Sequence, residues 1–180
     1  MPALSEPDEL DYLILHGARH AWSRLKWAAD VATILEKMPE AELSAMLERA
    51  TVAGARRPAL QALALCSLLF GLPMPAPAAA ELARSPLLRG LVGFALTEIT
   101  HGGGEIHREN QSWYGSGLQA LYHYFLRGGW RYRRSELRRD LVNPADWGTV
   151  RLPASLGGLY WPLRLPLWVW RKFFRPKGKA

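Results

Sequence analysis

The sequence predicts an all-α protein, and three observations lead to that prediction. Apolar residues recur at the spacing of helix faces through most of the chain, whereas the alternating pattern typical of strands is scarce. Proline and glycine punctuate the chain where these helical stretches would begin and end. With 180 residues, 49% hydrophobic and 22% charged, the chain is long enough to bury a core. We therefore expect a single irregular multi-helix domain over residues 1–180, with about six or seven helices.

The first predicted helix is the longest and covers roughly residues 6–38. Ser5 is a suitable N-cap, Pro7 is tolerated in a first turn, and Asp8 places a carboxylate near the positive end of the helix dipole. Pro39 cannot continue the helix and therefore sets its end. We expect this long N-terminal helix to lie at the centre of the domain.

Glycine and proline also divide the rest of the chain. Gly54 and Gly71 are placed as C-terminal caps of two further helices, and the Pro/Ala-rich residues 72–80 are predicted to be a connection. Three consecutive glycines predict a mobile Gly-rich loop over residues 101–111. The remaining expected elements are helices over 85–100, 116–128 and 130–142, and a Pro-punctuated C-terminal tail of short elements over 143–174.

The composition bears on two properties of the protein, its disulfide bonds and its cellular compartment. The single cysteine, Cys66, lies in an apolar run, so a disulfide framework is impossible and a buried thiol is expected. The N-terminus is acidic where a secretory signal would be basic. No uninterrupted apolar run reaches the length of about 18 residues that a membrane span requires. These features predict a cytoplasmic protein that does not span a membrane.

The net charge of +7 is unevenly distributed along the chain. Residues 1–100 hold 9 Lys and Arg against 11 Asp and Glu, whereas residues 101–180 hold 14 against 5. Six of the eight tryptophans also lie in the second part. An anionic partner would therefore meet the C-terminal part first.

The segment LHGARHAWSRLKWAADVATIL, residues 15–35, carries more polar and aromatic residues than a core helix needs. At about 100° per residue, its histidines, one tryptophan and its aspartate fall on one stripe, with basic residues on the flanks. Small apolar residues take the opposite face. The candidate stripe is His16, His20, Ser23, Trp27 and Asp30, flanked by Arg24 and Lys26.

Two other interpretations of this segment remain open from spacing alone. Its polar residues could be buried groups that satisfy backbone carbonyls, with Trp22 and Trp27 as core volume. His16 and His20, at i and i+4, could also share a zinc ion. No third ligand has suitable spacing, so we expect no metal site in this chain.

The same segment resembles the signature of a known family. Its pattern His-x3-His-x-Trp-x2-Leu-x-Trp-x2-Asp is similar to that of a large family of uncharacterised bacterial nucleotidyltransferases, related to the polymerase β-type superfamily. The preceding residues, LSEPDELDYLIL, resemble the lead-in to that helix. The ending NPADWGTVRLPASLGGLYWPLRLP resembles the C-terminal signature of the family, although WPLRLP departs slightly from it.

The resemblance implies that this chain corresponds to one part of a two-part enzyme. Family members have an N-terminal α/β catalytic core whose clustered carboxylates hold two Mg²⁺ ions around an NTP. The 180 residues contain no Gly-Ser followed by Asp-x-Asp, so we expect a helical C-terminal part with no catalytic residues of its own, inactive alone. The catalytic core would be supplied upstream or in trans, and Mg²⁺ is expected only with it.

The resemblance also suggests what the stripe contacts. It implies a surface that faces the nucleotide or the catalytic core, with Arg24 and Lys26 as candidates for phosphate charge. The stripe could equally be a structural seam between the two parts.

A basic segment suggests a different class of function. Residues 127–141 hold six arginines with interleaved aromatic residues, a composition that can follow a phosphate backbone and stack on bases. They could also form a solvated helix face paired with Glu136 and Asp140. Residues 161–179 combine aromatic and basic residues, which suits either a membrane interface or a docked terminal segment. The alternative function is thus a stand-alone basic binding module for nucleic acid or an anionic membrane, with candidate residues Arg131, Arg133, Arg134, Arg138 and Arg139.

Overall fold

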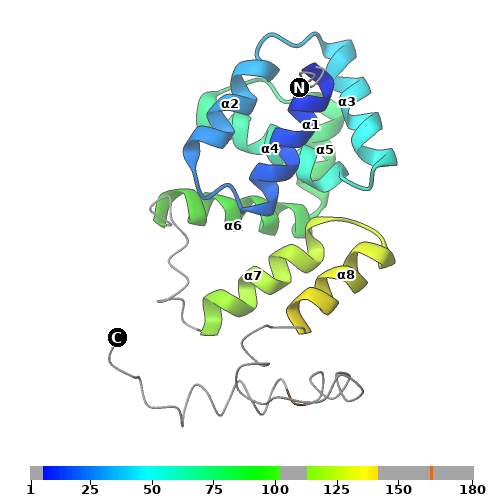
Figure 1. The fold of residues 1–180 in the computed structure, drawn as a ribbon. Helices are drawn as coiled ribbons and strands as arrows, with labels where there is room; N and C mark the ends of the chain where they lie inside the picture. The colour runs from blue at the N-terminus through cyan, green and yellow to red at the C-terminus, as the bar shows by residue number, and fades with distance from the viewer. Residues whose placement is uncertain (1–5, 102–112, 142–162, 164–180) are drawn as a thin grey trace, which may run out of the picture. The chain divides into compact units, whose positions relative to one another are not determined.

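A computed structural model describes residues 6–101, 113–141 and 163 of the chain (Figure 1). The secondary structure of these residues is entirely helical, which confirms the all-α prediction of an irregular multi-helix fold. The described part holds eight helices: α1 (Glu6–Arg19), α2 (Leu25–Leu35), α3 (Glu40–Val52), α4 (Arg56–Phe70), α5 (Ala76–Arg84), α6 (Pro86–His101), α7 (Trp113–Leu126) and α8 (Trp130–Leu141).

The chain divides into two compact units, residues 1–133 and residues 134–180. The first unit contains α1 to α7 and the start of α8, and it holds the core described below. Of the second unit, the structure describes residues 134–141 and 163. The predicted loop over 101–111 and the predicted C-terminal tail fall almost wholly outside the described residues, and a single domain over 1–180 stays a prediction.

Helix α4 is the centre of the first unit. Nine consecutive residues, Pro58 to Cys66, are buried, because α1, α2, α3, α5 and α6 all pack around this helix (Figure 1). This buried stretch is rich in alanine and leucine, with Gln61 as its polar residue, and a helix that is apolar on most sides is stable in such a position. The expectation that the N-terminal helix would be central is corrected accordingly: α1 packs on α4, which takes the central place.

The predicted long helix over residues 6–38 is wrong, because the chain breaks between α1 and α2. Ala21 and Trp22 have φ of 50° and 56°, in the left-handed region. The N–H of Trp22 donates to the carbonyl of Gly17 at 2.8 Å, and the N–H of Ala21 donates to the carbonyl of Ala18 at 3.1 Å. This pair of hydrogen bonds is the Schellman ending of a helix. It forms here without the glycine or asparagine that usually occupies the left-handed position.

Tertiary packing stabilises this unusual helix end. The Trp22 side chain is fully buried and lies on Gly17, where an added Cβ would come within 2.5 Å of the indole ring. Two left-handed residues with side chains cost roughly 1–2 kcal/mol each. Burial of a whole tryptophan side chain offsets this cost, so the break is determined by the core rather than by a local stop signal.

Other boundaries follow the local signals more closely. Gly54 (φ 65°) follows α3 and Gly71 (φ 72°) caps α4, as predicted. The predicted connection over 72–80 is partly wrong, because α5 begins at Ala76 after Pro75. Proline is accepted in a first helical turn, and the alanine run that follows has high helix propensity.

Candidate functional site

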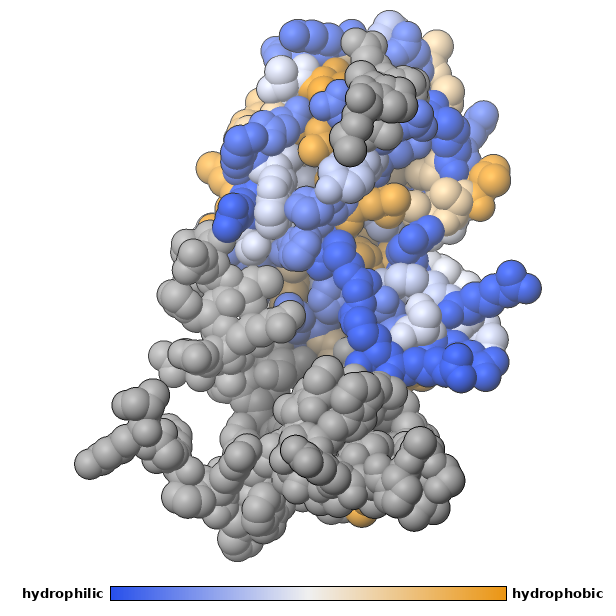
Figure 2. All heavy atoms as spheres, in the orientation of Figure 1, coloured by the Kyte–Doolittle hydropathy of each residue, from blue (hydrophilic) through white to orange (hydrophobic). Residues whose placement is uncertain are grey.

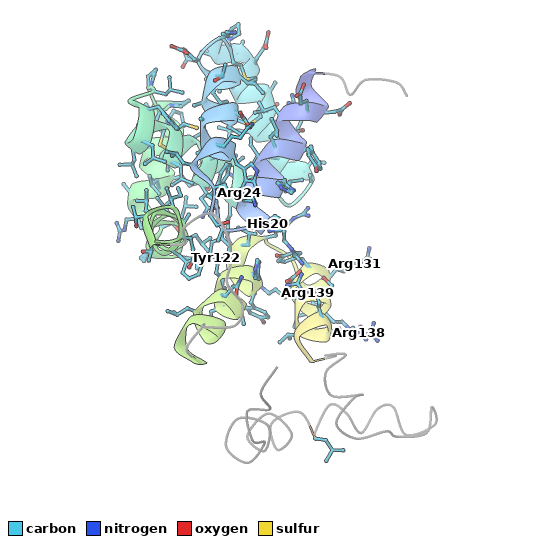
Figure 3. All side chains as sticks on the ribbon, turned by 60° about the vertical axis from the view of Figure 1, so that its left-hand side comes forward. His20, Arg24, Tyr122, Arg131, Arg138 and Arg139 are labelled. Carbon is cyan, nitrogen blue, oxygen red and sulfur yellow. The ribbon has the colours of Figure 1, made fainter. Side chains whose placement is uncertain are left out.

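A buried hydrogen-bond network fixes the junction of α1 and α2. Trp22 Nε1–H donates to Gln61 Oε1 at 3.1 Å, and Gln61 Nε2 donates to the carbonyl of Leu91 at 2.7 Å. The Tyr122 hydroxyl lies 2.7 Å from the carbonyl of Ala18 and 3.1 Å from Gln61 Oε1, so one proton has two acceptors. Figure 3 shows Tyr122 beside the turn that carries His20 and Arg24. The Gln61 network therefore ties the α1–α2 junction to α4, α6 and α7.

Burial keeps the polar groups of this network in their neutral forms. Gln61 is fully buried, and burial raises the pKa of the Tyr122 phenol, so the ring stays neutral and keeps its O–H as a donor. Buried polar groups that are all paired make a structure rigid and specific. The network therefore holds the junction in one conformation.

The outer side of the same junction carries a cluster of rings. The ring centroids of His16 and His20 lie 4.7 Å apart, and both lie near Trp27, at 5.0 and 5.4 Å. The Arg24 guanidinium lies 5.7 Å from the Trp27 ring centroid, within the range of a cation–π contact. Tyr12 stacks on His16 at 5.6 Å. We call these five side chains the ring cluster.

The other residues of the predicted stripe lie elsewhere. Ser23 is buried, 5% exposed. Lys26 donates to Asp30 at 2.6 Å along α2, and this pair is largely exposed. The predicted single stripe on one helix is therefore wrong. The structure brings His16, His20, Arg24 and Trp27 together, makes a separate ion pair of Lys26 and Asp30, and places Ser23 and Trp22 inside.

The electrostatics around His20 are one-sided. Its pKa is lowered, first by partial burial and then by the positive charges of His16, Arg19 and Arg24. Each of these positive charges disfavours the protonated form of the His20 ring. His20 is therefore predominantly neutral near pH 7.

Helix α7 adds a histidine that the sequence did not indicate. Burial, followed by the charges of Arg19 and His20, lowers the pKa of His123 to about 4. Its Nδ1 atom is buried and has no hydrogen-bond partner in the described structure. His123 follows His20 by more than a hundred positions, so no spacing pattern could connect the two.

The basic candidates on α8 have different surroundings. The Arg133 guanidinium lies 5.6 Å from the Tyr124 ring centroid and 5.7 Å from that of Phe125. Arg139 pairs with Glu136 through both of its terminal nitrogens, but the Glu136 side chain is buried rather than solvated. The Asp140 side chain lies outside the described residues. Arg131, Arg134 and Arg138 are exposed, and Figure 3 labels Arg131, Arg138 and Arg139 along the helix.

Two further kinds of site are absent from the described part of the chain. Among these residues, no group of three His, Cys, Asp or Glu side chains is arranged to hold a metal ion. None of the described helices is long and apolar enough to cross a bilayer. On the face shown in Figure 2, apolar side chains form small patches between hydrophilic ones.

Comparison with known proteins gives one match. Residues 1–71 match the sequence model of a family described as an uncharacterised nucleotidyltransferase. The matched range includes α1 to α4, and therefore the ring cluster and Gln61, whereas His123 and Tyr122 lie beyond it. A search of curated proteins and a search of solved structures gave no match.

Proposed function

We propose that this chain is the helical part of a nucleotidyltransferase of that family, and that its ring cluster faces the nucleotide or the catalytic core. The observation that carries the proposal is the family match over residues 1–71. That range contains every residue of the ring cluster, from Tyr12 to Trp27. It also contains the buried contacts of Trp22 with Gly17 and Gln61, which hold the turn that carries part of the cluster.

The proposal assigns the chemical step to another polypeptide segment. Nucleotidyl transfer with two metal ions needs clustered carboxylates that hold the metals and orient the attacking oxygen. Asp30, the acidic residue of the predicted stripe, is paired with Lys26, and the described residues offer no carboxylate cluster. The carboxylates that hold Mg²⁺ would therefore belong to a catalytic core supplied upstream or in trans.

The ring cluster has properties that suit a phosphate-bearing ligand. Arg24 carries a fixed charge on an exposed side chain, and a guanidinium binds phosphate oxygens in a bidentate manner. His16 and His20 can each donate from a ring nitrogen when protonated. These groups lie together around Trp27.

The direct test begins with the DNA upstream of the Met1 codon. An in-frame Gly-Ser and Asp-x-Asp core would identify the partner segment, which can then be expressed with this chain. Labelled NTP, Mg²⁺ and candidate acceptors should give no product above background with the 180-residue chain alone, and product with the combined parts. Metal-dependent labelling by the chain alone would contradict the proposal.

A second candidate function is supported by the exposed arginines of α8. Arg131, Arg134 and Arg138 could make contacts with nucleic acid or an anionic membrane. Binding of oligonucleotides and of anionic liposomes, measured at two salt concentrations, tests this function. It requires binding at low salt that weakens steeply as salt is added, and no binding at low salt would rule it out.

A further inference from the structure

His16 and His20 stand one helical turn apart at the end of α1. Helix α1 ends at Arg19, but the N–H of His20 still donates to the carbonyl of His16 at 3.1 Å, so the helical register continues through the pair. Side chains at positions i and i+4 of a helix lie on the same face. The centroids of the two imidazole rings are 4.7 Å apart. The two rings are therefore direct neighbours on one surface.

This separation fits a metal ion shared by the two rings. A zinc–nitrogen bond of about 2.0–2.1 Å, added to the ~1.1 Å between a ring nitrogen and its centroid, places the ion about 3.2 Å from each centroid. For nitrogen–metal–nitrogen angles between about 90° and 110°, the two centroids must then lie roughly 4.5–5.2 Å apart. The observed separation of 4.7 Å falls within that range.

Neighbouring aromatic side chains hold the two rings in place. The centroid of the Trp27 ring lies 5.0 Å from that of His16 and 5.4 Å from that of His20. The Tyr12 ring stacks on His16, with centroids 5.6 Å apart. Side chains that are ordered before binding lose less conformational entropy when a ligand binds. His20 is exposed, so an ion can reach the pair from solvent.

We propose that His16 and His20 chelate one divalent transition-metal ion, for which Zn²⁺ is the representative probe. Imidazole nitrogens suit Zn²⁺, Cu²⁺ and Ni²⁺, whereas Mg²⁺ prefers oxygen ligands. The ion is therefore chemically distinct from the Mg²⁺ of the proposed catalytic core, and the site goes beyond the proposed function.

Two protein ligands define the character of this site. The expectation of no metal site followed from the lack of a third protein ligand, and no third His, Cys, Asp or Glu joins the pair among the described residues. A metal ion with fewer than four protein ligands keeps coordination positions open to water or to an oxygen of another molecule. The Arg24 guanidinium also lies nearby, 5.7 Å from the Trp27 ring centroid, and its positive charge opposes a dication. We therefore expect weaker binding than in a site with four protein ligands.

The direct test uses the untagged 180-residue chain and Zn²⁺ at about pH 7.5. Competition with a chromophoric chelator should give one saturable site per chain. An NMR titration should shift the ring signals of His16 and His20 together, before those of the other histidines. Absence of saturable binding, or a shift of only one of these two rings, would overturn the proposal.

Single variants test whether the two rings act as one chelate. Loss of an outer-shell partner alone costs about 10–100-fold in metal affinity, so removal of a ligand by His16→Gln or His20→Gln should weaken Zn²⁺ binding at least tenfold. The double variant His101→Gln/His107→Gln removes two other histidines and should bind as the parent does. A smaller loss in either single variant, or an equal loss in the control, would overturn the proposal.

A metal-free thermal melt of each variant shows whether its fold is intact, because His16 is half-buried. The NMR titration of the parent chain needs no substitution and decides the question if a variant fails to fold. None of these measurements uses a nucleotide or the catalytic core. Their failure would therefore overturn the metal site and leave the family proposal to its own test, which is nucleotidyl transfer with the combined parts.

Discussion

Trp22 and Trp27 lie five residues apart at the same helix junction, yet their surroundings are opposite. The Trp22 ring is fully buried and its N–H is bonded to Gln61. The Trp27 ring is half-buried and meets His16, His20 and Arg24 on the outer side. The comparison shows that a sequence motif with regular spacing is divided by the helix break into a structural half and a surface half.

The largest expected effect is the difference between the two tryptophans on truncation. Trp22→Ala should lower the free energy of unfolding by about 3–5 kcal/mol, because a large buried side chain leaves a cavity. Trp27→Ala should cost about 1 kcal/mol, since much of its ring is in water in both states. Urea denaturation measures both values. Equal losses would contradict the division into two halves.

The next effect concerns the buried polar network. Gln61→Leu should cost about 3 kcal/mol, because the Trp22 N–H loses its acceptor and stays desolvated. Thr33→Val provides a control on an exposed helix face, where the hydroxyl donates to the Ala29 carbonyl, and should change stability by less than about 0.5 kcal/mol. Urea denaturation compares them. Similar values for the two variants would mean that the network does not hold the junction.

Substitution of Gly17 tests the close contact between α1 and the Trp22 indole. Gly17→Ala should cost about 2 kcal/mol, because the new methyl group overlaps the Trp22 ring. In the Trp22→Ala background the same change should be neutral or stabilising, since the space is free and alanine favours the helix. A double-mutant cycle measures the coupling, and additive costs would contradict this packing.

Acid should weaken the fold through His123. Its pKa is about 4 in the folded chain and 6.5 in the unfolded chain, so below pH 6.5 the unfolded state takes up the proton first. This contribution to stability is complete above pH 6.5 and is lost down to pH 4, at up to about 1.4 kcal/mol per pH unit. His123→Gln should make the dependence of stability on pH shallower in that window. An unchanged slope would contradict the assigned pKa.

The smallest effects are expected on the surface. His20→Ala and Asp30→Ala should each change the free energy of unfolding by only about 0.5 kcal/mol, since one is an exposed ring and the other belongs to an exposed ion pair. Thermal melts of the two variants test this. A large loss of melting temperature in both would make these residues part of the core, and the functional assignment of the ring cluster would fail.

The same division explains what the sequence could predict. Gly54 and Gly71 act through their own backbone conformation, so the helix ends beside them were predictable from local signals, whereas Pro39 lies at the start of α3 and α2 already ends at Leu35. The break after Arg19 depends on the packing of the Trp22 indole into a core built largely by α4. No residue next to the break predicts it from the sequence. His16, His20 and Trp27 stay together because the turn returns α2 toward α1. His123 comes from a distant helix and could be found only in three dimensions.

The left-handed pair Ala21 and Trp22 has a consequence for how the surface can vary. The backbone that carries His20 and Arg24 is held from inside, by an indole anchored on Gly17 and Gln61, and it does not depend on contacts among the exposed rings. The exposed positions can therefore be exchanged while their scaffold keeps its shape. Sequences that retain Gly17, Trp22 and Gln61 but differ at positions 16, 20 and 24 should share one backbone and present different side chains on its outer surface.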